Sequence, residues 1–378
     1  MQKCFKMFLY DTSCVVFLLF HGGDAELNSY EQILVDLVPF TPVEQAYKYI
    51  YEHQLSLETA FFHPVVQSII KVDALSEKIV RGTLNNLTHD PNLRESVMFT
   101  PDVDVRINLH PRYHPAISHS HDFFEIQYVL SGELNQTIAG HDMKLHPGDF
   151  CFIAPNVPHM LLAFTPNIYV LNLLIKRKVF TYAFSTLLSS EDLISNFFIR
   201  AIYSRNFYPY LINQTGSDST IQDLIARLID TAKINSTYTP RLLRTQFESL
   251  FLFLLRDHSK DFVSPSTNKK SQQKIIAMLS YLQENYTTTS LSDLAARFGY
   301  NSSYLSRALR DYTGKSFSQL LQDIRFEQAV LLLGTTDNNI ESVIEDIGYA
   351  DRSFFYREFK KRYGLSPAEY RKRINIKY

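Results

Sequence analysis

The stretches LSDLAARFGY (291–300) and YLSRALRDYTG (304–314) share one pattern with a second pair, IESVIEDIGY (340–349) and FFYREFKKRYG (354–364). In each copy, a short segment with apolar residues at helical spacing leads into a glycine and then a longer segment of the same type. The apolar positions of the two short segments match one for one: Leu291, Leu294, Ala295 and Phe298, then Ile340, Val343, Ile344 and Ile347. The sequence therefore predicts two units of helix, turn and helix.

Residues that begin and end helices stand at the borders of these segments. Ser290 with Asp293 forms a capping-box pattern, and Asn339 is a suitable N-cap for the second copy. Gly299 and Gly348 follow the short helices, where a left-handed residue is needed. The turns between the paired helices are therefore expected to be tight.

The second helix of each copy has one apolar face and one face of hydroxyl and basic side chains. Burial of Leu305 and Leu309, or of Phe355 and Phe359, leaves an opposite face made of Ser303, Ser306, Arg307 and Arg310, or of Ser353, Tyr356, Arg357 and Lys360. Such a helix suits the DNA major groove, where arginine reads guanine edges. The alternative, a solenoid of helix pairs, is disfavoured because two copies are too few to stack.

This region resembles the paired helix-turn-helix domain of AraC-type bacterial transcription regulators. The matching positions are Ala295, Gly299, Leu305, Arg325, Ala329, Leu333, Gly348-Tyr349, Ser353-Phe354-Phe355, Arg357, Phe359-Lys360-Lys361, Gly364 and SPAEYR at 366–371. Leu309 stands where the family usually has an aromatic residue. With the outward faces above, the resemblance implies DNA contacts by Ser302, Ser303, Ser306, Arg307 and Arg310, then by Arg352, Ser353, Tyr356, Arg357 and Lys360.

Length and charge distribution agree with a protein of several domains. The chain has 378 residues, 45% hydrophobic and 20% charged, and a net charge of −1. From Lys269 onward there are 17 Lys and Arg against 12 Asp and Glu, so the basic part is the part with the repeated helices. The three cysteines, Cys4, Cys14 and Cys151, form no CxxC pair, as expected in a reducing cytoplasm. The apolar run at 14–20 fits neither a signal peptide nor a membrane span, and no membrane association is expected.

Residues 1–100 are predicted to form a helical N-terminal extension. Thr41-Pro42-Val43-Glu44 is a capping box with proline at the first helical position, and a second helical stretch is expected near 65–80. No catalytic or metal-ligand spacing occurs there. An accessory helical cap or dimer contact is the favoured interpretation, with a partner-binding module as the alternative.

Residues 101–178 change to short strands separated by turns, which predicts a β-barrel or sandwich. HSHDFFEIQYVLSG (119–132) and GDFCFIAPNVPH (148–159) resemble the two cupin motifs. On one continuous strand His119, His121 and Glu125 would face the barrel interior together, and His159 could join them from a neighbouring strand.

These four side chains could hold a divalent transition metal. The resemblance instead favours a small organic effector bound without metal, and Val157 and Ala163 depart from the metal-binding cupin pattern. We therefore expect His119, His121, Glu125 and His159 to line an effector site, with no metal and no cofactor. A metal-dependent cupin enzyme or metal sensor fused to a DNA-binding domain remains the alternative, although no catalytic motif is evident elsewhere.

The expected fold class is a multidomain α+β protein. A helical extension (1–100) precedes a cupin-like β-barrel sensor (101–178), a helical dimerisation region (179–262), a linker (263–271) and an all-α domain of two helix-turn-helix units (272–378). The expected function is a cytoplasmic, non-enzymatic transcription regulator, by family habit an activator. Its expected partners are double-stranded operator DNA, a small-molecule effector such as a sugar, a second copy of the chain and RNA polymerase.

Overall fold

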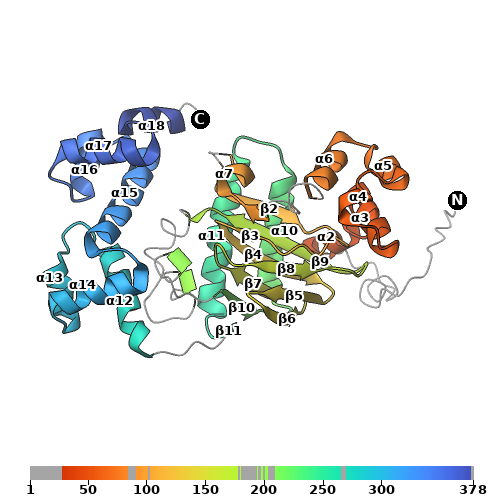
Figure 1. Cartoon of the computed structure of the whole chain (residues 1–378), viewed down its shortest axis with the longest axis horizontal. Helices are drawn as coiled ribbons and strands as arrows, with labels where there is room; N and C mark the ends of the chain where they lie inside the picture. Colours follow the sequence, from red (N-terminus) through yellow and green to blue (C-terminus); the bar gives the residue numbers. More distant parts are fainter. Residues whose placement is uncertain are drawn as a thin grey trace.

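The computed structural model places a β-barrel between two groups of helices, with the C-terminal helices and α3–α6 at opposite ends (Figure 1). The structure describes residues 28–83, 91–100, 103–177, 179, 194, 197, 198, 201, 202, 209–264 and 270–375. The apolar run at 14–20, Cys4, Cys14 and most of residues 180–208 lie outside these residues. Among the described residues, no helix has the length and apolar character that a membrane crossing requires.

Six helices of the described chain precede the main barrel strands, and four of them, α3 to α6, form a small core of their own, whereas Tyr30 and Ile33 of α2 pack into the barrel core. The six are α2 (Ser29–Asp36), α3 (Pro42–Glu52), α4 (Leu57–Ala60), α5 (Pro64–Ile70), α6 (Ala74–Gly82) and α7 (Glu95–Met98). The predicted capping box of Thr41 and Glu44 starts α3. The stretch expected near 65–80 is two helices, because the chain turns after Ile70 and Asp73 caps α6. The core of this group includes Tyr47, Ile50 and Val66.

The barrel is built from two main sheets. Six strands follow the order β11-β10-β7-β4-β9-β2, three follow β6-β5-β8, and β1 pairs with β3. Their bounds are β1 (Asn92–Leu93), β2 (Val105–Leu109), β3 (Ser120–His121), β4 (Phe124–Ser131), β5 (Leu134–Ile138), β6 (His141–Leu145), β7 (Asp149–Ile153), β8 (His159–Leu162), β9 (Tyr169–Ile175), β10 (Tyr210–Gln214) and β11 (Phe262–Val263). The strands expected between 124 and 175 are confirmed.

Two features of the barrel differ from the sequence-based expectation. The strand carrying His119, His121 and Glu125 is not continuous, because the chain bends at Asp122 and Phe123 between β3 and β4. Asp122 accepts a hydrogen bond from the Glu95 amide, and Phe123 packs in a side cluster against Phe99. In addition, β10 lies within the region expected to be helical and pairs antiparallel with β7.

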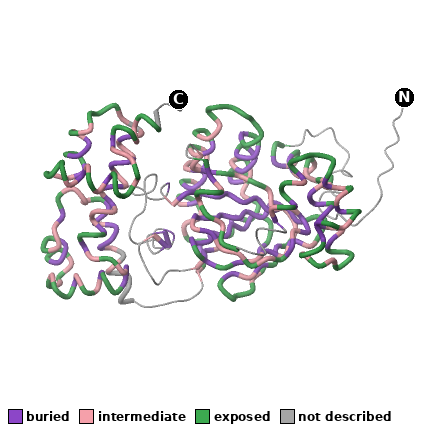
Figure 2. The backbone as a smooth tube through the Cα atoms, turned by 45° about the horizontal axis from the view of Figure 1, so that its top comes forward, coloured by how far each residue is buried: buried purple, intermediate pink, exposed green. Residues whose placement is uncertain are grey.

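Helices α10 (Ser219–Lys233) and α11 (Thr239–Asp257) pack against the barrel. Most residues on their apolar faces belong to the barrel core, and Figure 2 shows purple, buried stretches of chain throughout the barrel. Leu242 of α11 is nevertheless 50% exposed, and Tyr238, one turn earlier, is 72% exposed. The apolar face of α11 is therefore mainly intrachain core, with an exposed apolar margin near its start.

The C-terminal helices form two small cores joined by one long helix. They are α12 (Lys270–Glu284), α13 (Leu291–Phe298), α14 (Ser302–Thr313), α15 (Phe317–Thr335), α16 (Ile340–Asp346), α17 (Arg352–Tyr363) and α18 (Pro367–Asn375). The first half of α15 contributes Phe317, Leu320 and Ile324 to the core around α13 and α14. Its second half contributes residues such as Phe326 and Leu333 to the core around α16 and α17. Because α15 belongs to both cores, it fixes how the two units are placed relative to each other.

Candidate DNA-binding surface and effector site

Both predicted helix-turn-helix units are present, with their predicted caps. Ser290 and Asp293 form a capping box on α13, and Asn339 accepts from the Ser342 amide at the start of α16. Gly299 and Gly348 are left-handed, with φ of 72° and 81°. The turns into α14 and α17 therefore have the geometry that the sequence predicted.

The predicted DNA-contacting side chains lie on the outer faces of α14 and α17. Leu305 and Leu309 are buried beneath α14, and Phe355 and Phe359 beneath α17. The opposite faces carry exposed Ser303, Arg307, Arg310, Arg352, Ser353, Arg357 and Lys360, and partly buried Ser302, Ser306 and Tyr356. Both helices therefore leave their basic and hydroxyl side chains accessible to a large polyanion.

Two of these arginines have partners on their own unit. The Arg352 guanidinium lies 2.7 Å from a carboxylate oxygen of Glu345, and Arg357 lies over the Phe354 ring at 5.4 Å. Both interactions are exposed, so the cost of breaking them to meet a phosphate or base is small.

One exposed aromatic residue was not singled out from the sequence. Tyr304, in the first turn of α14, is 48% exposed and its ring stacks on Tyr300 at 5.1 Å between ring centres. The spacing of the two tyrosines was the available signal. An exposed tyrosine beside Ser303 adds a hydroxyl donor at the end of the helix that enters a groove in other helix-turn-helix proteins.

Charged contacts brace the two units against α15. Asp323 of α15 pairs with Lys315, which follows α14, at 2.6 Å and with Arg362 of α17 at 2.7 Å. Arg325 of the same helix donates to the carbonyls of Tyr286 and Thr287 at 2.9 Å. These basic side chains therefore connect α15 to other elements of the domain.

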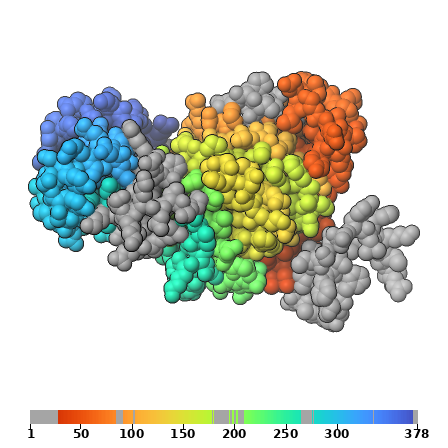
Figure 3. Space-filling view, turned by 60° about the horizontal axis from the view of Figure 1, so that its bottom comes forward, coloured from red at the N-terminus to blue at the C-terminus, as the bar shows by residue number. Residues whose placement is uncertain are grey.

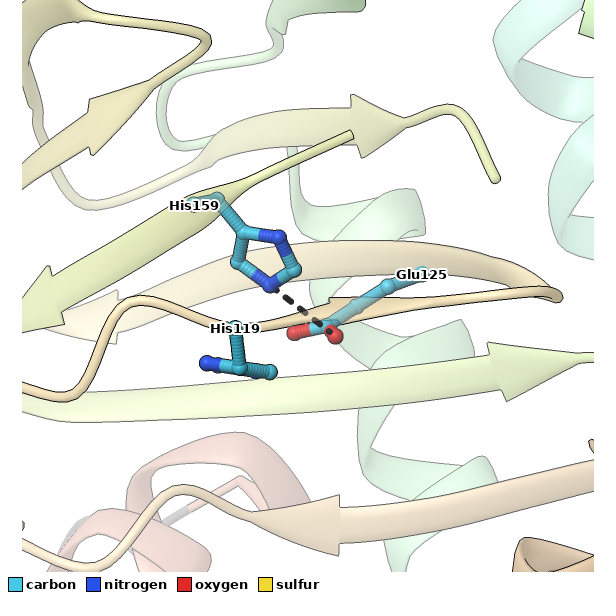
Figure 4. Close-up of side chains that lie close together, drawn as sticks. All are labelled: His119, Glu125 and His159. Atoms are coloured by element: carbon cyan, nitrogen blue, oxygen red, sulfur yellow. Dashed lines mark ion pairs between the residues drawn. The ribbon is translucent and has the colours of Figure 1, made fainter. Parts of the chain in front are cut away.

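In the barrel, the structure brings the four predicted residues together. His119, Glu125 and His159 each offer a ligand atom, and these atoms lie within 4.8 Å of one another (Figure 4). A carboxylate oxygen of Glu125 lies 3.0 Å from Nε2 of His121 and 3.6 Å from Nε2 of His159. His121, Glu125 and His159 are all at most 4% exposed. The cluster forms despite the break in the strand, because β4 places Glu125 beside the ends of β3 and β8.

The backbone fixes which nitrogen of each imidazole faces the carboxylate. Nδ1 of His119, His121 and His159 lies 3.1, 2.8 and 3.0 Å from the carbonyl oxygens of Ile117, Phe123 and Val157. A carbonyl only accepts, so each Nδ1 carries the hydrogen. In a neutral ring, Nε2 then carries a lone pair. The Nε2 lone pairs and the Glu125 carboxylate would repel one another unless a proton or a cation lies between them.

The pKa shifts show how protons are shared in this cluster. Burial would raise the pKa of Glu125, but His121 and His159 outweigh it and hold that pKa well below its usual value. Burial would lower the pKa of His159, and the Glu125 carboxylate raises it instead. Burial, aided by His159, lowers the pKa of His119 to about 4. The lowered pKa of Glu125 and the raised pKa of His159 both favour an ion pair between these two residues.

Comparisons with known proteins match both parts of the chain. A family profile described as a helix-turn-helix domain matches residues 294–373, and one described as a cupin domain matches residues 105–165. The first span covers nearly all of the two helix-turn-helix units, and the second covers most of the barrel strands.

Three relatives are regulators of transcription by name. The raffinose operon transcriptional regulatory protein RafR of Pediococcus pentosaceus is 28% identical over 70% of this chain and 91% of its own length. The HTH-type transcriptional activator RhaS of Escherichia fergusonii is 26% identical over 73% of this chain and 95% of its own. The uncharacterized HTH-type transcriptional regulator YisR of Bacillus subtilis is 31% identical over 40% of this chain and 50% of its own.

The order of the parts agrees with these matches: a cupin-like barrel precedes paired helix-turn-helix units, and relatives named as regulators align along most of their own lengths. The chain belongs to the AraC-type transcription regulators.

Proposed function

We propose that this regulator grips two successive major-groove segments of an operator with α14 and α17. The observation that carries this proposal is the sharing of α15 between the two cores, which holds the two outward basic helices in one fixed arrangement. A helix of 19 residues is about 28 Å long, near the repeat of about 34 Å between successive major grooves on one face of DNA. One chain would then read an asymmetric half-site.

In this proposal the exposed side chains divide into two roles. Arg307 and Arg357 reach base edges, with Ser303, Ser306, Ser353 and Tyr356 beside them. Arg310 and Lys360, farther along their helices, contact phosphates together with Ser302 and Arg352. The first group would determine sequence preference, and the second would set affinity and its dependence on salt.

DNA binding by the full-length protein tests this assignment. A footprint on the DNA upstream of its own gene would identify an operator, and binding would be titrated against salt. Arg307→Ala and Arg357→Ala should each weaken binding by about 1–3 kcal/mol and relax preference at one base position. Arg227→Ala, an exposed arginine of α10, is the control and should leave binding unchanged. Unchanged operator affinity in both recognition-helix variants would refute the groove assignment.

We further propose that the barrel binds a small organic effector at His119, His121, Glu125 and His159. The converging donors and acceptors could fix the orientation of a small polar molecule such as a sugar. The name of the relative RafR refers to a raffinose operon, so raffinose and related sugars are the first compounds to test. A thermal-shift screen would find an effector, since a ligand that binds only the folded protein raises its apparent stability. Loss of that shift in Glu125→Gln would place it in the barrel.

The remaining elements of the proposal concern assembly and context. Exposed Tyr238 and Leu242 support a homodimer formed through α11. Sedimentation equilibrium of Leu242→Glu against the parent chain tests this proposal, and an unchanged association constant would contradict it. We propose activation of transcription in the cytoplasm through contact with RNA polymerase, and no catalytic activity.

A second candidate function, response to a divalent metal ion, is supported by the protonated Nδ1 atoms in the barrel. Because each Nδ1 donates to a carbonyl, the Nε2 lone pair of the same ring points toward the cluster. Histidine ligands of Zn²⁺ and similar ions are commonly oriented in this way. The residues therefore fit such an ion, with His119, Glu125 and His159 as its ligands. Elemental analysis of protein purified without a histidine tag decides between the candidates. Near-stoichiometric metal that is lost in His159→Ala would favour this function, and its absence would leave the organic effector.

A further inference from the structure

A cleft of about 500 Å³ lies between the N-terminal helices and the rim of the barrel. Its walls come from α3 and the turn after it, from the loop after β2 and from Phe164 after β8. The orange helices lie directly against the barrel in the space-filling view (Figure 3). None of the four histidine and glutamate residues of the barrel cluster lines this cleft.

Aromatic side chains form the main walls of the cleft. Tyr51 stacks on Phe164 with ring centres 4.7 Å apart, and its ring is 5.5 Å from that of Tyr113. Tyr47 lies beneath them, fully buried, with its hydroxyl hydrogen-bonded to Thr83. Rings assembled in this way present apolar faces suited to a flat ligand.

Two lining residues have backbone conformations that are unfavourable for their type. Tyr113 and Gln54 have φ of 60° and 50°. A bulky residue in the left-handed region costs about 1–3 kcal/mol and is retained where the surrounding structure enforces it, often at binding sites. Here the Tyr113 amide donates to the Ala163 carbonyl at 2.7 Å, which holds the ring in the wall of the cleft.

The residue before Tyr113 fastens this wall to the N-terminal helices. Arg112 is 1% exposed, and its guanidinium binds both carboxylate oxygens of Glu44 at 2.8 and 3.0 Å. It also donates to the carbonyls of Val38, Pro39 and Pro166. The two sides of the cleft are therefore held together before any ligand arrives, which lowers the entropy cost of binding.

The charges around the cleft limit the type of ligand. Among the described residues that line the cleft, none carries a positive charge and Glu52 is the one charged residue. The Glu52 carboxylate lies 3.8 Å from the Lys48 ammonium, so the net charge at this edge is close to zero. An anion at this edge would have to compete with the Glu52 carboxylate for the Lys48 ammonium. The carboxylate can only accept hydrogen bonds, so a fitting ligand donates one.

We propose that this cleft is a binding site for a small uncharged aromatic compound that donates a hydrogen bond to Glu52, separate from the effector site in the barrel. The ring of the compound packs against Tyr51 and Tyr113. The loop that carries Tyr113 continues to His119, so the occupied cleft adjoins the barrel cluster along the chain. This site does not depend on the proposed occupant of the barrel.

Benzyl alcohol and benzoate are matched probes, because they share a ring and differ in charge and in the hydrogen-bond donor. Saturation-transfer NMR on the full-length protein, with each probe at millimolar concentration, detects weak binding directly. We expect transfer to benzyl alcohol and at least tenfold weaker binding of benzoate. Glu52→Gln should reduce this preference, because it removes the carboxylate that accepts a hydrogen bond from benzyl alcohol and competes with benzoate for Lys48. No transfer to benzyl alcohol, or equal binding of the two probes, would overturn the proposal.

Variants then locate the probe. Tyr51→Ala should abolish transfer, and since Tyr51 is 48% exposed the fold should tolerate it, which a thermal unfolding curve verifies. Phe62→Ala, at a 72% exposed aromatic residue of the same helical group that does not line the cleft, is the matched control and should bind normally. Glu125→Gln should also bind normally. Binding lost in Glu125→Gln but retained in Tyr51→Ala would place the compound in the barrel and refute a separate site.

Discussion

Gly348 and Gly299 occupy equivalent positions in the two helix-turn-helix units, yet the structure predicts different responses to alanine. Both are left-handed, so a side chain costs about 1–2 kcal/mol at either position. A Cβ atom at Gly299 would meet nothing within 4 Å, whereas at Gly348 it would lie 2.5 Å from the Thr287 carbonyl oxygen. That carbonyl cannot easily move, because Arg325 donates a hydrogen bond to it.

The clash at Gly348 adds a second cost to the conformational one. Forcing a methyl group into a filled space typically destabilises a protein by about 1–3 kcal/mol. We therefore expect Gly299→Ala to lower the free energy of unfolding by about 1–2 kcal/mol and Gly348→Ala by about 2–5 kcal/mol. Replacing glycine by alanine reduces the conformational entropy of the unfolded chain by the same amount in both variants, so this effect on stability cancels in the comparison.

Urea denaturation of the full-length variants, followed by far-ultraviolet circular dichroism, measures the difference. Hydrogen exchange in peptides covering Thr287 and α16 would show where Gly348→Ala acts. Faster exchange confined to that region is expected, because the clash lies between the turn of the second unit and the loop before α13. Equal losses of stability in the two variants would refute the close approach of Thr287 to this turn.

Two further predictions concern buried carboxylates. Glu44→Gln should lower the free energy of unfolding at pH 7 by about 3 kcal/mol, because it leaves the buried Arg112 charge without its partner. Glu31→Gln, in the exposed capping box of α2, is the control and should cost no more than about 1 kcal/mol. Burial would raise the pKa of Glu44, but Arg112 outweighs it and lowers that pKa. The stability that the Glu44 carboxylate contributes is thus complete above its ordinary pKa of 4.5 and is lost as the pH falls through its lowered pKa. A difference in melting temperature between Glu44→Gln and the parent that stays constant from pH 7 to pH 3 would contradict this explanation. Burial, with Asp323 nearby, raises the pKa of Glu327 to about 7, so ionising this residue should destabilise the fold increasingly from pH 4.5 to pH 7. Glu327→Gln should therefore be neutral at pH 4 and more stable than the parent by about 1–3 kcal/mol at pH 8, and a gain independent of pH in calorimetry would argue against it.

The parts of the fold that were predictable from the sequence depend on neighbours along the chain. The caps at Ser290 and Asn339, the glycines after α13 and α16, and the alternation of buried and outward side chains on α14 and α17 are all local rules. Family resemblance extended them to the DNA-contacting residues, and these assignments remain predictions. The residues of the barrel cluster were also found from a local motif.

What could not be predicted depends on distant contacts. The bend at Asp122 and Phe123 follows from partners at Glu95 and Phe99, which no spacing rule connects to this strand. β10 is short and gains its partner from β7, far back in the chain. Arg112 looks like an ordinary surface arginine in the sequence, and only its position among Glu44 and three carbonyl groups explains its burial. The aromatic cleft likewise needs Tyr51, Tyr113 and Phe164 to meet.

Because α15 is part of both cores, its length determines the rotational phase between the two units. Each residue of an α-helix turns the chain by about 100° and advances it by about 1.5 Å. Inserting one residue at the middle of α15 would swing the second unit about a quarter of a turn away from the DNA face that the first unit meets. Seven inserted residues would nearly restore the phase while adding about 10 Å of separation. The intervals by which evolution or design can respace these two units are therefore set by whole turns of a single helix.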